Sequence, residues 1–190
     1  MIFAFSTSSP IASVAVFTQD GQLIWSGQDH APHAASGACM RLLSECEVQT
    51  GAKVREGALF IADLGPGSFT GVRVGIVLAK AFAYLNKVEC AGAVAFDLIN
   101  PTGIAFVPSR KNEVFIRMPG DAPTRDSVAP HEALGYGISE REANYPLASN
   151  FRPLLEGLIR MQPVELVPAY FAEPSISLPK RAYSREVGSS

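Results

Sequence analysis

The sequence predicts an α/β fold on a mixed sheet, with a βββαβαβ opening and a reduced second lobe. The turn sequence at 18–21, between the second and third of three short apolar runs, is typical of a β-hairpin. Apolar strands and helices then alternate, as in a parallel sheet with crossover helices. After Phe96 the periodic signal weakens. We therefore expect an N-terminal lobe at 1–97 and a shortened C-terminal lobe and tail at 98–190.

Each element of the first half has its own pattern. Three short apolar segments predict an antiparallel meander. The first helix is predicted where Cys39, Leu42, Leu43 and Cys46 recur at the spacing of one helical face. A second, longer helix follows a loop rich in Gly, Pro, Ser and Thr. The expected elements are strands at 2–6, 12–17 and 22–27, a helix at 36–48, a strand at 58–63, a helix at 68–85 and a strand at 88–92.

The second half offers fewer signals. Residues 104–107 and 113–118 predict a strand pair around a polar turn. Residues 151–161 can form a helix with Pro153 in its first turn, a position that proline tolerates. The remaining expectations are a short linking helix at about 91–99, a stretch without periodicity at 119–130 and an extended tail at 173–190.

Composition and charge narrow the function classes. The chain of 190 residues is 47% hydrophobic and 18% charged, a globular composition with somewhat few charges, which hints that a partner covers some surface. The net charge of -2 shows no overall excess of basic residues of the kind that nucleic-acid-binding proteins usually have, so we expect no direct nucleic-acid binding by this chain alone. The N-terminus lacks a signal-peptide pattern and no apolar run suits a membrane span, so we expect a cytoplasmic protein without membrane contact.

Cysteines and histidines give no sign of a metal or redox site. Cys39 and Cys46 are seven residues apart on a predicted helix, which separates them by roughly 10 Å, too far for a disulfide. All three cysteines are interpreted as small core residues in a reducing compartment. His30 and His33 enclose Pro32, which does not favour a helical metal pair. We expect no metal and no cofactor.

The loop before the second long helix is the most specific local feature, and it matches no catalytic motif. A Walker loop needs Lys and Ser/Thr after its last glycine, whereas Gly71 is followed by Val72 and Arg73. The dinucleotide fingerprint has one residue fewer between its glycines, and a nucleophile elbow needs a different spacing. We assign no catalytic residue, although backbone N–H groups at 67–70 leave phosphate binding open. The loop consists of Gly65, Pro66, Gly67, Ser68, Phe69 and Thr70.

Small residues recur at every fourth position of the following helix, which allows another helix to approach closely. The helix is apolar nearly all round, which indicates burial on more than one side. The stripe can pack inside the subunit, against 36–48, or across an interface with a second chain, and we expect the interface. The expected interface residues are Gly71, Val72, Arg73, Gly75, Ile76, Ala79, Lys80 and Ala83, with Cys39 and Leu43 from the preceding helix.

The loop and helix start, GPGSFTGVRVG at 65–75, resemble the signature of the TsaB (YeaZ) family, inactive paralogues of TsaD/Kae-type proteins. The opening strand that ends in Ser-Thr-Ser-Ser-Pro at 6–10, and Ala-Ser-Val-Ala at 12–15, are also similar. The resemblance covers roughly residues 1–100, and it continues more faintly at RKNEVF and in the proline-aromatic stretch at 167–174.

The resemblance implies an actin-like ATPase (ribonuclease H-like) fold, with 1–97 as its N-terminal ribonuclease H-like lobe. It also implies a non-catalytic subunit that supports TsaD in making threonylcarbamoyladenosine in tRNA, with a TsaE-like ATPase as a further partner. Members of the family self-associate as homodimers or pair with TsaD through the helices that correspond to 36–48 and 68–85. On this basis the loop is a structural turn and the helix an interface helix.

The chain departs from the family pattern in ways that bear on catalysis. Ser6 stands where the family usually has an aspartate, the acid that active relatives place near phosphate and metal. The usual His-Ser before the first helix is loosened to His33-Ala34-Ala35-Ser36, and Pro108-Ser109 replaces an expected aspartate. The alternative function is a nucleotide-hydrolysing or glycoprotease-like enzyme of the same fold. The missing aspartate and the absence of an H-x-x-x-H pair disfavour that alternative.

Overall fold

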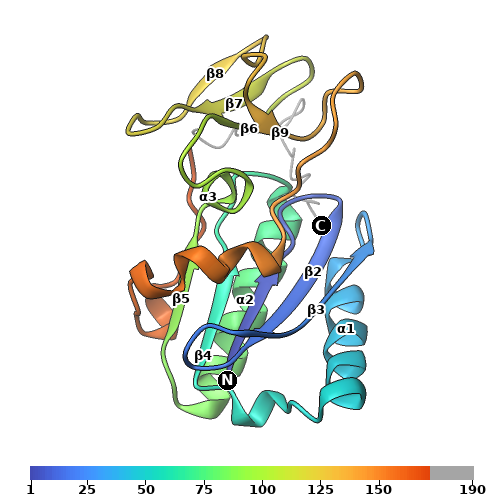
Figure 1. Cartoon of the computed structure of the whole chain (residues 1–190), viewed down its shortest axis with the longest axis vertical. Helices are drawn as coiled ribbons and strands as arrows, with labels where there is room; N and C mark the ends of the chain where they lie inside the picture. The colour runs from blue at the N-terminus through green and yellow to red at the C-terminus, as the bar shows by residue number, and fades with distance from the viewer. Residues whose placement is uncertain (172–190) are drawn as a thin grey trace, which may run out of the picture.

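The structure, a computed structural model, describes residues 1–171, so the tail expected at 173–190 lies outside the described residues. Two lobes follow one another along the long axis of the molecule (Figure 1). The larger lobe contains the N-terminus and the long helices, and the smaller lobe consists mainly of short strands.

The larger lobe is built on a five-stranded sheet with the strand order β3-β2-β1-β4-β5. In the opening meander β2 pairs antiparallel with both β1 and β3, whereas β1, β4 and β5 run parallel. This arrangement confirms the mixed sheet and the βββαβαβ opening. The strands are β1 (Ile2–Ser6), β2 (Ile11–Phe17), β3 (Leu23–His30), β4 (Leu59–Asp63) and β5 (Cys90–Ala93).

Two helices cover one face of this sheet, α1 (Ala35–Thr50) and α2 (Phe69–Asn86), with the short 3-10 helix η1 (Val54–Glu56) between them in sequence. Alternate strand residues such as Phe3, Phe5 and Phe60 point to these helices, because successive side chains of a strand face opposite sides. Both helices therefore confirm the expected elements at 36–48 and 68–85.

The opposite face of the sheet is covered by a segment that returns from the smaller lobe. The 3-10 helix η2 (Ala148–Gly157), orange in Figure 1, crosses the sheet on the side away from α2. Its Phe151 is fully buried in a cluster with Ile2, Phe17 and Ile61. Residues 148–157, which fall within the expected second lobe at 98–190, therefore pack on the sheet of the larger lobe and cover its apolar second face.

The same segment differs in type from the expected helix at 151–161. Pro153 lies inside η2 and has no backbone N–H to donate, which disfavours a regular α-helix there. A last short helix, η3 (Pro163–Glu165), lies against α2.

The smaller lobe is a four-stranded sheet with the order β8-β7-β6-β9. Its central strands, β6 (Ala105–Pro108) and β7 (Val114–Arg117), form the expected antiparallel pair. Two shorter strands complete it, β8 (Thr124–Asp126), inside the stretch expected to lack periodicity, and β9 (Leu134–Gly135). The helix α3 (Ala95–Ile99) links the lobes and is shorter than expected, because β5 takes residues 90–93.

Within the described chain, every helix is too short or too polar to cross a bilayer.

Candidate partner-binding surface

The glycine-rich loop joins β4 to α2 and is held by hydrogen bonds within the subunit. Gly65 has a φ of 83°, which favours glycine, and its N–H donates to the Asp63 carboxyl at 2.8 Å. Ser68 caps α2 by accepting from the Gly71 N–H at 3.2 Å. The Ser68 N–H donates to the Ser8 carbonyl at 2.7 Å. The Ser68 N–H, one of the groups at 67–70 that could have held a phosphate, is therefore already satisfied.

Thr7, which follows β1, inserts its hydroxyl into the first turns of α2. Its Oγ1 donates to the Gly71 carbonyl at 2.7 Å and accepts from the Gly75 N–H at 3.0 Å. These two groups would bond to each other in a regular α-helix. A Cβ at Gly71 would lie 2.0 Å from the Thr7 carbonyl oxygen, and one at Gly67 would lie 2.2 Å from the Ser8 carbonyl oxygen. The glycines are therefore needed so that this turn can pack on the helix.

The stripe of small residues lies on the inner face of α2. Gly71, Gly75, Ala79 and Ala83 are all buried within the single subunit. The expectation that they face another helix across a subunit interface is wrong, because β1 and its turn occupy the space beside them. A small-residue stripe indicates close approach, but it does not say whether a helix or a strand approaches.

Four other expected interface residues are also in the core, each 6% exposed or less: Val72, Ile76, Cys39 and Leu43. Burial raises the pKa of the Cys39 thiol to about 12, so that thiol is protonated at neutral pH. The cysteines are free and buried, as expected. Of the expected interface set, only Arg73 and Lys80 reach the surface.

The outer face of α2 carries large apolar side chains in contact with solvent. Phe69 is 57% exposed, Val77 60%, Tyr84 76% and Leu85 71%. The guanidinium of Arg73 lies over the Phe69 ring, 3.7 Å from its centroid, in a cation–π contact. A contiguous exposed apolar surface on one helix is typical of an interaction site.

A groove of about 650 Å³ separates this face from residues 163–170. The Tyr170 ring lies 6.4 Å from the Phe69 ring, and Lys80 donates to the Leu166 carbonyl at 3.2 Å. The segment adds more exposed apolar side chains, so the surface is continuous across the groove. We call it the α2 outer surface, and its large apolar members are Phe69, Val77, Tyr84, Val164, Val167 and Tyr170.

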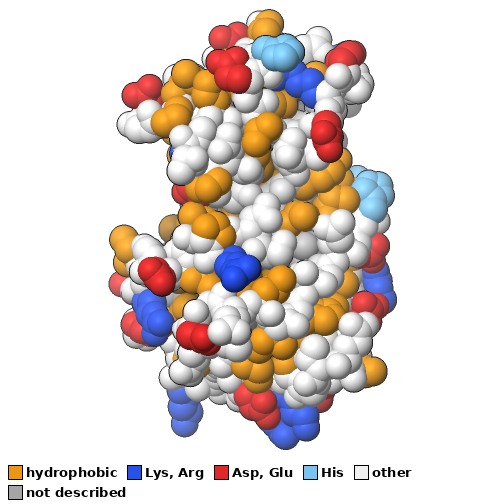
Figure 2. Space-filling model, viewed as in Figure 1, with side chains coloured by type: hydrophobic (Ala, Val, Ile, Leu, Met, Phe, Trp, Pro, Cys, Tyr) orange, Lys and Arg blue, Asp and Glu red, His pale blue; other side chains and the backbone are white. Residues whose placement is uncertain are grey.

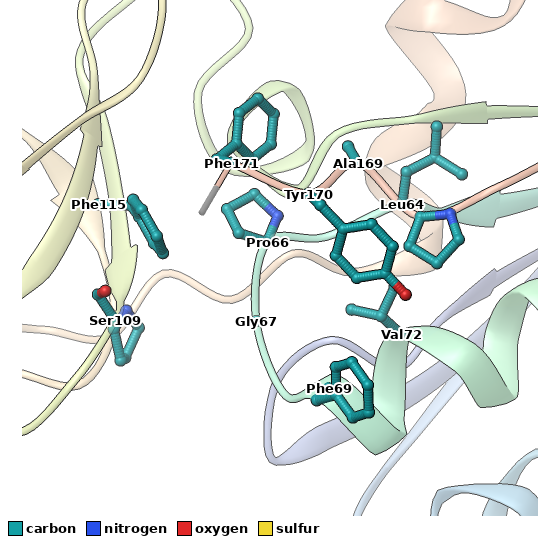
Figure 3. Close-up of a pocket in the computed structure, with 12 residues that line it drawn as sticks. Leu64, Pro66, Gly67, Phe69, Val72, Ser109, Phe115, Ala169, Tyr170 and Phe171 are labelled. Atoms are coloured by element: carbon teal, nitrogen blue, oxygen red, sulfur yellow. The ribbon is translucent and has the colours of Figure 1, made fainter. Parts of the chain in front are cut away.

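A smaller cavity of about 140 Å³ lies between the glycine loop and the smaller lobe. Figure 3 shows Pro66 and Tyr170 on one side and Phe115 and Ser109 on the other. Ligand pockets usually measure several hundred Å³, so this cavity is too small for a nucleotide.

A larger cleft of about 790 Å³ lies between the lobes, over the starts of α1 and α2. Figure 2 shows the narrow waist between the lobes, with mostly uncharged atoms at its surface. Arg41 lines the cleft but pairs with Asp29 at 2.5 Å. In residues 1–171 no three His, Cys, Asp or Glu side chains converge as metal ligands would. The cleft has the volume of a ligand site, and its lining is mainly uncharged.

Sequence reasoning missed Asp63, the last residue of β4. It is 1% exposed, and its Oδ2 lies 2.8 Å from the Ser6 Oγ. Burial raises the pKa of the Asp63 carboxyl above its ordinary value of 3.8, and neighbouring polar groups such as the Gly65 N–H only partly offset the rise. The closeness of Ser6 and Asp63 depends on the parallel register of β1 and β4, which local sequence patterns do not contain.

Solved structures share this fold over nearly the whole chain. An uncharacterised protein with similarity to peptidase YeaZ, from Pseudomonas aeruginosa, superposes with a TM-score of 0.74 at 18% identity, covering 90% of this chain and 99% of that one. YeaZ from Pseudomonas aeruginosa superposes with a TM-score of 0.70 at 17% identity, covering 89% of this chain and 98% of its own. The chain has the YeaZ fold.

The resemblance to YeaZ in the sequence is thus confirmed at the level of the fold. No protein-family model matches the sequence, and no curated protein is detectably similar to it. In this example of the YeaZ fold, the glycine-rich loop and the inner stripe of α2 are packing elements. The α2 outer surface is the feature best suited to contact another molecule.

Proposed function

We propose that this protein is a TsaB (YeaZ)-type subunit that binds a TsaD-type subunit and supports threonylcarbamoyladenosine formation in tRNA without catalysing it. The α2 outer surface is the observation that carries the proposal. In the part of the chain that the structure describes, its large apolar side chains are exposed to water, and a partner protein that covers them would remove that contact. The GPGSFTGVRVG signature and the YeaZ fold support this kind of partner.

The chemistry around β1 supports a non-catalytic role over the alternative of a nucleotide-hydrolysing or glycoprotease-like enzyme. Ser6 cannot replace the carboxylate that active relatives place near phosphate and metal. The neighbouring carboxyl, Asp63, is buried and bonded to Ser6 and Gly65 rather than presented to the cleft.

Other parts of the proposal follow from the resemblance. The strand order β3-β2-β1-β4-β5 agrees with an actin-like ATPase (ribonuclease H-like) fold. The working form is a homodimer or a TsaD heterodimer in the cytoplasm, with a TsaE-like ATPase as a further partner. The tRNA is held by other subunits, in keeping with the net charge of -2.

A reconstituted reaction tests this function. Purified TsaD-type and TsaE-type proteins and tRNA from the same organism are combined with ATP and an activated threonylcarbamoyl donor, with and without this chain, and the modified nucleoside is measured by mass spectrometry. We expect product only when the chain and the TsaD-type protein are both present. Product formed by this chain without the TsaD-type protein would make it the enzyme, and equal yields with and without it would reject a supporting role.

A further inference from the structure

Ser6 lies between two oxygen atoms but has one proton to donate. Its Oγ is 2.5 Å from the Pro146 carbonyl oxygen and 2.8 Å from Oδ2 of Asp63. A carbonyl oxygen can only accept, so the Ser6 hydroxyl satisfies Pro146 by donating its proton there. The short contact with Asp63 then needs a proton from the carboxyl itself.

We propose that Asp63 is a neutral carboxylic acid in the folded protein and forms, with Ser6, a proton-dependent latch on the chain at Pro146. The Asp63 O–H donates to the Ser6 Oγ, and Ser6 donates to the Pro146 carbonyl. When Asp63 loses its proton, a carboxylate and a carbonyl compete for one hydroxyl proton. One of the two contacts then opens.

The surroundings of Asp63 favour the neutral acid. Its other oxygen, Oδ1, accepts from the Gly65 N–H at 2.8 Å. The groups that face it are Ser6 at the end of β1, Ser8 in the turn that follows, Gly65 in the glycine loop and Tyr136 from the smaller lobe. Burial raises the pKa of Tyr136, so its phenol is neutral too. Among residues 1–171 no Lys, Arg or His side chain pairs with Asp63.

The latch sits where the chain leaves the smaller lobe and returns to the large sheet. Two residues after Pro146, the Ala148 N–H donates to the Ser13 Oγ at 2.9 Å. Ser6 and Ser13 are opposite each other on β1 and β2, so adjacent strands hold the return segment at two points. The latch therefore controls how firmly η2 and the smaller lobe are tied to the sheet beside the cleft.

The sign of the pH dependence follows from the raised pKa of Asp63. Between 3.8 and its folded pKa, the native state binds more protons than the unfolded state. The contribution of Asp63 to the free energy of unfolding is therefore complete below pH 3.8, and it is lost as the pH rises through the pKa of Asp63 in the folded protein. Asn at this position keeps an acceptor for Gly65 and a donor for Ser6 at every pH, so Asp63→Asn imitates the protonated latch.

Two measurements test the latch. Infrared difference spectra of wild type and Asp63→Asn at neutral pH should show the carbonyl stretch of a protonated carboxyl in the wild type only. Thermal unfolding of both from about pH 5 to about pH 8 should show the Tm of Asp63→Asn rising relative to wild type as the pH increases. Absence of the carboxyl band, a Tm difference that does not change with pH, or an Asp63→Asn chain that does not fold would each overturn the proposal.

Amide hydrogen exchange provides a further test in a variant that leaves Asp63 unchanged. Ser6→Ala removes the relay and should speed exchange of the Ala148 amide several-fold, while amides in the middle of α2 keep their wild-type rates. Unchanged exchange at Ala148 would show that Ser6 does not hold the return segment.

Discussion

Gly71→Ala is expected to destabilise the protein more than any other single methyl group added to α2. The new Cβ would lie 2.0 Å from the Thr7 carbonyl oxygen, a backbone atom of the β1 turn that cannot rotate away. Overpacking of a rigid site typically costs about 1–3 kcal/mol, and this contact lies at or above the upper end. The free energy of unfolding in urea, followed by circular dichroism, measures the loss.

Gly37→Ala is the matched control. Gly37 is also a helical glycine, but a Cβ there would meet only the end of the Arg41 side chain, at 3.6 Å. Alanine in such a position should stabilise the protein by roughly 0.5–1 kcal/mol. If the urea midpoints of unfolding of Gly71→Ala and Gly37→Ala were both equal to or higher than that of the wild type, the close packing of Thr7 on α2 would be refuted.

Ala79→Trp is expected to prevent folding rather than to separate subunits. Ala79 is 0% exposed, and its side chain belongs to the cluster between α2 and the sheet, so an indole there must displace β1 or β4. Ala81→Trp, two residues along the same helix, is the control because Ala81 is exposed and should accept the indole without loss of structure. Circular dichroism and light scattering compare the two. If the Ala79→Trp chain were folded and monomeric, the small residues of α2 would have to face another subunit, and the inward packing described here would be contradicted.

Much of the larger lobe could be predicted because its signals are local. The hairpin turn at Gly21, with a φ of 84°, and the 3.6-residue spacing of α1 depend on neighbours in sequence. The position of η2 could not be predicted. Its apolar residues, such as Phe151 and Leu154, indicate one buried side, but nothing local to them says which face of which sheet they cover.

The candidate site was predictable only in part, for the same reason. The spacing of Gly71 and Gly75 correctly indicated close approach, but the inserted group is the Thr7 hydroxyl, 68 residues away from Gly75 in sequence. The side chains exposed for a partner are instead those of Val77 and Tyr84, on the other side of the helix. Exposure depends on which face of an apolar helix meets the sheet, and a helix apolar nearly all round does not reveal it.

The central claim is that α2 packs inward through its small residues and binds a partner through its outer surface. Isothermal titration of the TsaD-type protein from the same organism with wild type, Val77→Glu and Val128→Glu tests it most directly. Val128 is 69% exposed on the smaller lobe and Val77 60% exposed on α2, so the two variants place the same charge at similarly exposed sites.

We expect Val77→Glu to weaken binding by about tenfold or more, since a carboxylate would be buried in an apolar interface. Val128→Glu should bind like wild type, and all three proteins should show the same Tm. Equal affinity of Val77→Glu and wild type, or no binding by the wild type, would contradict the account.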